Sequence, residues 1–524
     1  MKKKIKQKII TVCLSIMTLV SFLTTGCGSK VPDDNYRNYY EIFVGSFYDS
    51  DGNGIGDLNG ISEKLDYIKD LGCNGIWLTP IMPSTTYHKY DVIDYCDVDS
   101  ELGTIDDFKK LVKACHKKDI RIIIDMVINH SSAENRWFLE ASSYLKSLPE
   151  GENPDTEACP YVDYYHFSKE YPGNGWCKLE GTDYYYECQF WDQMPDLNLD
   201  NPNLMKELQG IFDFWIDLGV DGFRMDAPLH YEEGDTEFNC RILNSVYEYC
   251  KSKNPDFYMV SEVWASESTI ADYYQSLTPS FFNFDAADAE GRLVKTARGT
   301  GKAANFVKSM VDYQESFSAN NPDYIDAVFI TNHDMARVAN NLMSDDQNIR
   351  FAAGLLSTMS GNTFLYYGEE IGMKSKGTKD ENKRLPMRWS SSDTKGIPNP
   401  PKDADQDIEQ TFEGVSEQLK SDDSILNYYR KAYNLRLKYP EIARGNITVL
   451  DNLTDGHQAV IRKDYEDTYI FVAYNTSDEV ISVNISEISD AKKKICESLN
   501  MDATANRIDG DVLIMQPKSI TYFK

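Results

Sequence analysis

The chain has 524 residues, a length that predicts two or three structural units rather than one simple domain. Its formal net charge is −29 at pH 7, and the first 26 residues carry five lysines and no acid, so the remainder is more acidic still. An acidic surface repels nucleic acid and anionic lipid, so we expect no nucleic-acid partner and favour a neutral substrate or a bound cation. Aromatic residues make up 12% of the chain, which suits sugar binding without being diagnostic.

The chain begins with a predicted targeting segment. Residues 1–8 are basic, residues 9–23 are mostly apolar, and Thr25-Gly26-Cys27 resembles a bacterial lipobox. We therefore expect a signal peptide over 1–26, lipidation of Cys27, a polar tether over 27–36, and a protein anchored by lipid on the extracellular face of a bacterial membrane. Thr24 stands where a lipobox usually has leucine, which leaves ordinary secretion and a retained membrane anchor as alternatives. No later run is apolar and long enough to cross a bilayer.

The cysteines allow one limited prediction. Nine remain after Cys13 and Cys27, and an odd number excludes complete intramolecular pairing. Cys159, Cys177 and Cys188 fall in one segment and could include a disulfide. The chain has no CxxC pair and no Cys/His ligand spacing, so we do not expect zinc.

Residues 49–57 read Asp-Ser-Asp-Gly-Asn-Gly-Ile-Gly-Asp. Oxygen-bearing side chains recur at every second position, and the glycines between them allow the tight curvature that wraps a hard cation. Gly60 stands where an EF-hand loop would have its bidentate glutamate, so this is not a complete EF-hand, and a solvated turn is the alternative. We predict a calcium site whose ligands are the side chains of Asp49, Asp51, Asn53 and Asp57 and the carbonyl oxygen of Ile55.

The middle of the chain predicts an α/β fold. The unalternated Ile and Val run at 121–130 is typical of a parallel strand that is covered on both faces. Eight such strands alternate with helical stretches such as 61–71 and 108–117, and this alternation predicts a (β/α)8 TIM barrel over 37–130 and 191–435. The predicted strands are 40–47, 75–80, 121–130, 220–225, 257–262, 281–284, 327–331 and 363–365.

Two regions break this alternation. Residues 131–190 hold no clear βα unit but many Tyr, Gly and Pro, which predicts a small domain inserted after the third strand. From about residue 440 the chain changes to short β-rich runs, which predict an antiparallel β-sandwich domain over 440–524.

Acidic residues follow three of the predicted barrel strands, at the end where barrel enzymes carry their chemistry. They are Asp226, Glu262 and Asp334. Two carboxyl groups that flank an acetal bond are what glycoside hydrolysis requires, one ionised and one protonated. Arg224 shares a strand face with Asp226 and would keep it ionised, whereas Glu262 has apolar neighbours that disfavour its charged form.

Several segments resemble the signature regions of the α-amylase family of glycoside hydrolases, in order and spacing. The resemblance covers nearly everything from Tyr39 onward, although the last domain matches only by position and β character. The four main segments are 125–130, 222–230, 262–264 and 329–334, and further matches are 75–80, 194–198, 364–372 and 384–389.

The resemblance implies a retaining mechanism, in which the two reacting carboxyl groups lie about 5–5.5 Å apart. Asp226 would attack the anomeric carbon, Glu262 would act as acid and then base, and Asp334 would hold sugar hydroxyls. Tyr90 would stack under the sugar ring in the same subsite. The other implied substrate-binding residues are Arg224, His130 and His333, with Asp91 and Asp125 either supporting Arg and His side chains or touching the sugar directly.

The resemblance also implies the substrate class. Segment 194–198 and the calcium loop are similar to those of members that stand between the oligo-1,6-glucosidases and the α-amylases proper. We expect a monomeric α-amylase that cleaves α-1,4 links in starch, glycogen or maltodextrins. Pro228-Leu229 replaces residues among which many starch-cutting members have lysine, so α-glucosidase, neopullulanase or transglycosylase action remains open. A noncatalytic maltodextrin-binding protein is the alternative from another class, and the retention of all three acids argues against it.

Overall fold

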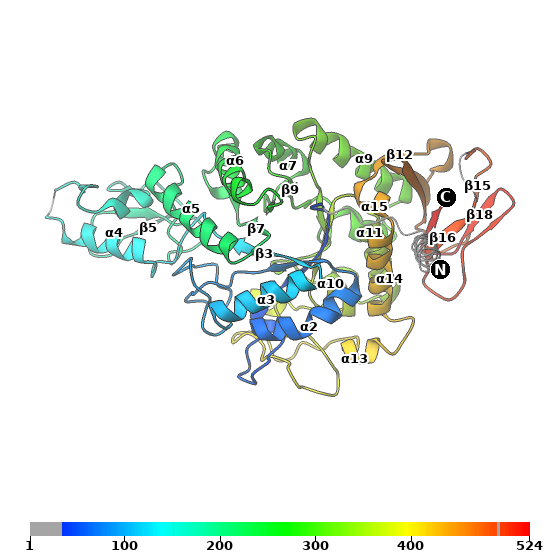
Figure 1. The fold of residues 1–524 in the computed structure, drawn as a ribbon, viewed down its shortest axis with the longest axis horizontal. Coiled ribbons are helices and arrows are strands. Elements are labelled where there is room, and N and C mark those ends of the chain that lie inside the picture. The colour runs from blue at the N-terminus through cyan, green and yellow to red at the C-terminus, as the bar shows by residue number, and fades with distance from the viewer. Residues whose placement is uncertain (1–33, 150, 490–492) are drawn as a thin grey trace, which may run out of the picture.

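The computed structural model describes residues 34–149, 151–489 and 493–524. The predicted signal peptide, Cys27 and most of the tether lie outside the described residues. Figure 1 shows the β/α barrel in the middle of an elongated molecule, with the segment around α4 and β5 at one end and the C-terminal sheets around β15 and β18 at the other. Within the described ranges, no helix combines the length and the apolar character needed to cross a membrane.

The central sheet has eight parallel strands in the order β10-β11-β1-β2-β3-β7-β8-β9. A parallel bridge between Phe282 and Ala327 joins its two outer strands, so the barrel is nearly closed and the predicted fold is confirmed. The strands are β1 (Asn38–Ile42), β2 (Gly75–Leu78), β3 (Arg121–Met126), β7 (Gly222–Met225), β8 (Tyr258–Ser261), β9 (Ser280–Phe281), β10 (Ala327–Phe329) and β11 (Asn362–Tyr366).

Helices alternate with these strands and cover the barrel. Their caps follow from local sequence: Thr104 and Asp107 form a capping box at the start of α3, and Gly72 ends α2 with a left-handed φ of 94°. The principal helices are α2 (Leu58–Leu71), α3 (Ile105–Lys117), α5 (Pro202–Asp217), α6 (Thr236–Lys253), α7 (Glu267–Tyr273), α9 (Ala303–Asn320), α11 (Asp346–Thr358) and α14 (Ile425–Lys438). The shorter ones are α8 (Arg292–Ala297), α10 (Val338–Asn341), α12 (Asp380–Lys383), α13 (Val415–Gln418) and α15 (Pro440–Arg444).

Two barrel strands end four or five residues earlier than predicted. The predicted strand 40–47 ends at Ile42, because a 3-10 turn over Val44–Ser46 begins the loop at its carboxyl end. The predicted strand 121–130 ends at Met126, and the chain then pairs with the inserted segment instead: the Leu197 backbone N donates to the Asn129 carbonyl oxygen at 2.8 Å. Residues 127–130 are therefore not part of the barrel sheet, contrary to the predicted strand.

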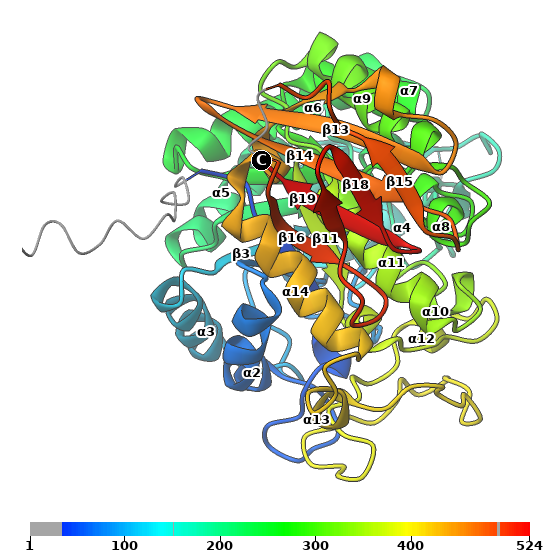
Figure 2. The same cartoon turned by 90° about the vertical axis from the view of Figure 1, so that its right-hand side faces the viewer.

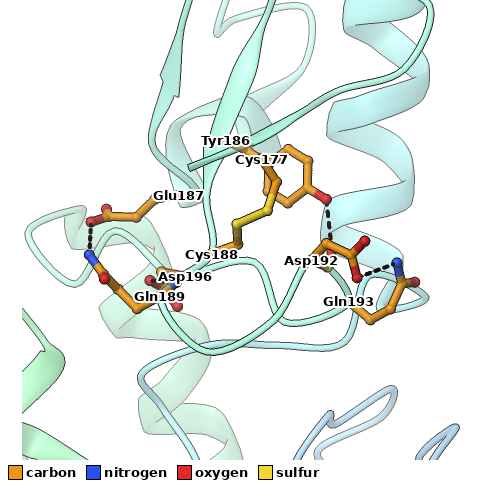
Figure 3. The surroundings of a disulfide bond; sticks show 8 residues. All are labelled: Cys177, Tyr186, Glu187, Cys188, Gln189, Asp192, Gln193 and Asp196. Atoms are coloured by element: carbon orange, nitrogen blue, oxygen red, sulfur yellow. Dashed lines mark hydrogen bonds between the residues drawn. A yellow bond between two sulfur atoms is a disulfide. The ribbon is translucent and has the colours of Figure 1, made fainter. Parts of the chain in front are cut away.

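The inserted segment contains a helix that was not predicted, α4 (Arg136–Ser147), whose buried residues Phe138, Ala141 and Leu145 recur at helical spacing. A small antiparallel sheet follows, in the order β4-β6-β5. A disulfide joins Cys177 and Cys188 within this segment (Figure 3). Cys159 is buried and is not part of it. The strands of the sheet are β4 (Phe167–Ser168), β5 (Trp176–Lys178) and β6 (Tyr185–Glu187).

The C-terminal part has two antiparallel sheets, as predicted, and Figure 2 shows them covering one end of the barrel. Lys463 ties the larger sheet to the barrel, because its buried ammonium donates to the carbonyl oxygens of Thr358 at 2.7 Å and Ile442 at 2.6 Å. The larger sheet contains β12 (Asn446–Val449), β13 (Gln458–Tyr465), β14 (Thr468–Asn475), β19 (Ser519–Phe523) and β16 (Ile495–Leu499). The smaller one contains β15 (Ile481–Asn484), β18 (Val512–Met515) and β17 (Arg507–Asp509).

Candidate active site

A cleft of about 360 Å³ opens at the carboxyl ends of the barrel strands. Asp226 directly follows β7, Glu262 directly follows β8, and Asp334 lies in the loop after β10. The structure therefore brings together three acids whose first and last members, Asp226 and Asp334, are 108 residues apart in the sequence. The residues that line the cleft are His88, Tyr90, His130, Phe190, Met194, Asp226, Ala227, Leu229, His230, Glu262, Trp264, Asp334, Asp380 and Arg384.

Arg224 lies beneath the cleft and binds three carboxyl groups. Its Nη1 is 2.6 Å from Asp125 Oδ1 and 2.6 Å from Asp226 Oδ1, and its Nη2 is 2.7 Å from Glu262 Oε2. The guanidinium is fully buried and lies 5.2 Å from the centre of the Trp77 ring. Because Asp226 and Glu262 bind the two nitrogens of one planar group, their carboxyl groups lie side by side at the floor of the cleft.

The ion pair between Arg224 and Glu262 was not predicted. From the sequence we expected Arg224 to pair with Asp226 alone and Glu262 to have only apolar neighbours. Burial nevertheless raises the pKa of Glu262 to about 7; Arg224 opposes the rise, and the negative charges of Asp226 and Asp334 add to it. The direction of the shift and its main cause, burial, were therefore anticipated, whereas the contribution of the neighbouring acids was not. A carboxyl group of this pKa holds a proton near neutral pH.

Asp334 is held by two cations. Its Oδ2 lies 3.0 Å from His333 Nε2, and its Oδ1 lies 2.6 Å from Arg384 Nη2. Burial raises the pKa of Asp334, but these two partners outweigh burial and hold it well below its usual range. Conversely, burial lowers the pKa of His333, yet Asp334 and Glu41 raise it to about 10. Asp334 is thus an ionised acceptor that faces the cleft.

Tyr90 and His130, which were predicted to bind substrate, both line the cleft. Tyr90 bridges the two charged groups: its hydroxyl lies 3.1 Å from Asp125 Oδ2 and 2.7 Å from His333 Nε2. His130 is 2% exposed, and its Nε2 has no hydrogen-bond partner among the described residues. A buried donor without a protein partner suits a sugar hydroxyl.

Asp91 is fully buried and does not line the cleft, so of its two expected roles the structure favours support of other side chains over contact with the sugar. Its buried carboxylate accepts hydrogen bonds from the hydroxyls of Ser84, Thr85 and Thr86 rather than from an Arg or His side chain. Thr86 Oγ1 in turn lies 3.1 Å from Nδ1 of His88, which lines the cleft. Asp91 therefore orders the loop that presents His88, and the sequence carried no signal for the hydroxyls that surround it.

Sequence reasoning missed several residues of the cleft wall. Arg384 was quoted as the start of a matching segment but received no role, although it holds Asp334. Phe190 and Trp264 are 49% and 48% exposed, and both line the cleft. Trp264 stacks on Phe284 with ring centres 4.9 Å apart, which holds its ring in the cleft wall. Its position two residues after the acid was the available signal.

The acidic loop before α2 gathers the side chains of Asp49, Asp51 and Asp57, whose carboxylate oxygens lie within 4.8 Å of one another. Asp49 curls the loop by accepting from the backbone N of Gly52 at 2.7 Å and of Gly54 at 2.8 Å, two glycines with positive φ. Three carboxylates this close repel one another unless a cation lies between them, and hard cations prefer such oxygens. Asn53 and Ile55 belong to the same turn, since the Ile55 backbone N donates to Asn53 Oδ1 at 2.7 Å.

A barrel whose strand ends bring together carboxyl groups of different protonation meets the chemical requirement of a glycoside hydrolase, and comparison with known proteins gives the family. Residues 41–445 match the family described as alpha amylase, catalytic domain. The chain belongs to the α-amylase family of glycoside hydrolases.

The chain is 38% identical to alpha-amylase 3 of Dictyoglomus thermophilum over 483 residues, which cover 90% of this chain and 91% of that protein. It is 28% identical to an oligo-1,6-glucosidase of Heyndrickxia coagulans over 531 residues, which cover 86% of this chain and 91% of that protein. The solved structure of Eubacterium rectale Amy13B superposes with a TM-score of 0.92 at 41% identity, covering 95% of this chain and 97% of that one.

Proposed function

We propose that this enzyme hydrolyses α-1,4-glucosidic bonds in starch, glycogen or maltodextrins, with retention of the anomeric configuration. The observation that carries this proposal is the pair of carboxyl groups on Arg224, one of which, Glu262, keeps its proton near neutral pH. Retention needs two close carboxyl groups of different protonation, whereas inversion needs a gap wide enough for a water molecule.

In this mechanism Asp226 attacks the anomeric carbon while Glu262 protonates the leaving oxygen. The resulting glycosyl–Asp226 ester is then hydrolysed by a water molecule that Glu262, now ionised, deprotonates. Asp334 accepts hydrogen bonds from the hydroxyls of the reacting sugar, and His130 Nε2 donates to another. Arg224 stabilises the negative charge of Asp226 before the attack and the negative charge of Glu262 after Glu262 has given up its proton.

The half-exposed rings of Phe190 and Trp264 support a substrate longer than one sugar. A pyranose ring has an apolar face that packs on an aromatic ring, and these two rings flank the cleft beyond the acids. An α-glucan chain that extends past the cleaved bond would cover both.

Calcium, anchoring and oligomeric state complete the proposal. The side chains of Asp49, Asp51, Asn53 and Asp57 and the Ile55 carbonyl would hold calcium, which supplies the positive charge that this loop lacks. Cys27 would carry the lipid that holds a monomeric enzyme on the outer face of the membrane, where α-glucans are available. The proposed chemistry at Asp226 and Glu262 involves neither the calcium, nor the lipid anchor, nor the oligomeric state.

A second candidate is exo-acting cleavage that includes α-1,6 links. The similarity to an oligo-1,6-glucosidase and the Pro228-Leu229 sequence before His230 favour it. Product analysis on amylose, pullulan and panose separates the two. A mixture of maltooligosaccharides from amylose with α-anomers released first supports the main proposal. Glucose with maltose from panose, which requires cleavage of the α-1,6 bond, supports the second, and first release of β-anomers would contradict both.

A further inference from the structure

A buried acid on β1 lies below the cleft and is not used by the mechanism above. Alternation along β1 divides its side chains: Tyr40 points outward, where its hydroxyl donates to Glu370 at 2.6 Å. Tyr39 points into the barrel and stacks on Phe364 with ring centres 4.8 Å apart. Glu41 shares the inward face with Tyr39 and is 1% exposed. A carboxylate inside a barrel is costly unless it is paired.

The partner of Glu41 is His333. Oε1 of Glu41 lies 2.6 Å from His333 Nδ1 and accepts from the His333 backbone N at 3.2 Å. The other ring nitrogen, Nε2, lies 3.0 Å from Asp334 Oδ2 and 2.7 Å from the Tyr90 hydroxyl. A neutral imidazole carries only one N–H, so it cannot donate to a carboxylate at each end. When both acids are ionised, contact with both requires the doubly protonated ring. Burial raises the pKa of Glu41, and the hydrogen bonds from the His333 ring and backbone N–H oppose that rise.

We propose that Glu41 is a positioning residue for catalysis: it holds His333 as an imidazolium whose Nε2–H is directed at Asp334 and at the sugar hydroxyl that Asp334 binds. This inference rests on the role proposed above for Asp334. Without the charge of Glu41, the ring would keep a single proton, and a proton kept at Nδ1 would leave the Nε2 lone pair facing the Asp334 carboxylate.

The charged surroundings of His333 agree with this assignment. Burial disfavours the imidazolium, but Asp334 and Glu41 outweigh it and raise the pKa of His333. The carboxyl groups of Asp125 and Glu262 also interact with the ring. The positive groups nearby are already paired, since Arg224 binds acids and Arg384 binds both Asp334 and the His333 carbonyl oxygen. Further titratable groups beside the pair are the Tyr90 hydroxyl, which lies 2.7 Å from His333 Nε2, and Tyr366, which interacts with Glu41.

The test combines histidine NMR with a pH–rate profile. The chain has seven histidines, and the ring signal of His333 in protein with labelled histidine is assigned by its loss in a His333→Gln variant. In the unmodified protein we expect this signal to stay that of an imidazolium from about pH 6 to about pH 9. In Glu41→Gln it should titrate within that range, and kcat should fall on the order of 10- to 100-fold, as when the partner that orients a ligand histidine is lost.

In the same variant, the loss of activity with rising pH should involve two protons instead of one, because His333 and Glu262 then both titrate. Glu41→Asp keeps the charge and should restore part of the imidazolium signal. Glu370→Gln is the matched control: it makes the same change at a buried glutamate whose partners are Tyr40 and Tyr67, and it should leave the His333 signal as it is.

A His333 that titrates near pH 7 in the unmodified protein would overturn the proposal, and this measurement needs no Glu41 variant to fold. An unchanged signal and pH profile in Glu41→Gln would overturn it equally. Failure of the proposed function is separately visible, because an unmodified protein that cleaves no α-glucan can still be scored for the protonation of His333.

Discussion

Two clusters of acids lie near the same end of the barrel, and the repulsion between their negative charges is balanced in different ways. At the cleft, Asp125, Asp226 and Glu262 surround Arg224, so the chain supplies its own cation. In the loop before α2, Asp49, Asp51 and Asp57 gather without an ion pair to any described basic side chain. The first cluster is buried and fixed by the fold. The second has no internal cation among the described residues, and the calcium proposed for it would come from solution. We therefore expect changes in the first cluster to affect the chemistry and changes in the second to affect stability.

The largest effect is expected from removing the nucleophile. Asp226→Asn should lower kcat on the order of 10⁴-fold or more, because the amide cannot form the glycosyl ester. Turnover of a soluble maltooligosaccharide measures it. The matched change in the loop, Asp51→Asn, should leave kcat of the folded, calcium-saturated enzyme within a few-fold of the original. Substantial residual activity of Asp226→Asn would remove Asp226 from its proposed role.

Removing the internal cation should affect folding as well as activity. Arg224→Gln leaves buried carboxyl groups without a partner and should cost about 3–5 kcal/mol of unfolding free energy. The midpoint of urea unfolding measures this loss. Arg292→Gln, which breaks an exposed pair with Asp285, should cost at most about 1 kcal/mol. Equal shifts in the two variants would show that Arg224 is not the cation on which the cleft depends.

The pH dependence of kcat/KM distinguishes the two clusters. Glu262 must be protonated to act as the acid, and its pKa is raised to about 7, so activity should fall as pH rises through about 7. Above that value the fall should approach tenfold per pH unit. The position of this limb should be the same at saturating and at moderate calcium concentrations. A limb that moves with calcium would place the loop in the chemistry.

The smallest expected effect is that of chelation. If the loop binds calcium, a concentration one hundred times Kd stabilises the fold by about 2.7 kcal/mol, which chelation would remove. We expect a decrease of a few degrees in Tm by calorimetry, and a smaller decrease in Asp51→Asn. An unchanged Tm on chelation would show that Asp49 and its neighbours form a solvated turn.

The barrel could be predicted because its strands are short apolar runs separated by helices, a pattern that each segment carries locally. The three acids could be placed because parallel strands bring their carboxyl ends to one face. The bridge from Arg224 to Glu262 could not, since it joins neighbouring strands across a contact that no local pattern encodes. The hydrogen-bond partners of Asp91 could not be predicted for the same reason, because they are three hydroxyls of a loop without periodicity. The α4 helix was hidden by the Tyr, Gly and Pro residues around it.

The disulfide of the inserted segment lies one residue before Gln189 and two before Phe190, and Figure 3 shows the chain turning from Cys188 into Gln189 and on past Asp192. This covalent tie anchors the wall that faces the acids, whereas the acids themselves depend only on the barrel. Enzyme produced in a reducing cytoplasm would lack the disulfide, and enzyme exported to an oxidising compartment would have it. Both forms would share the same bond-breaking step. They would differ in the affinity with which the disulfide-anchored wall binds a long polysaccharide. The redox state of the disulfide must therefore be known when affinities are compared.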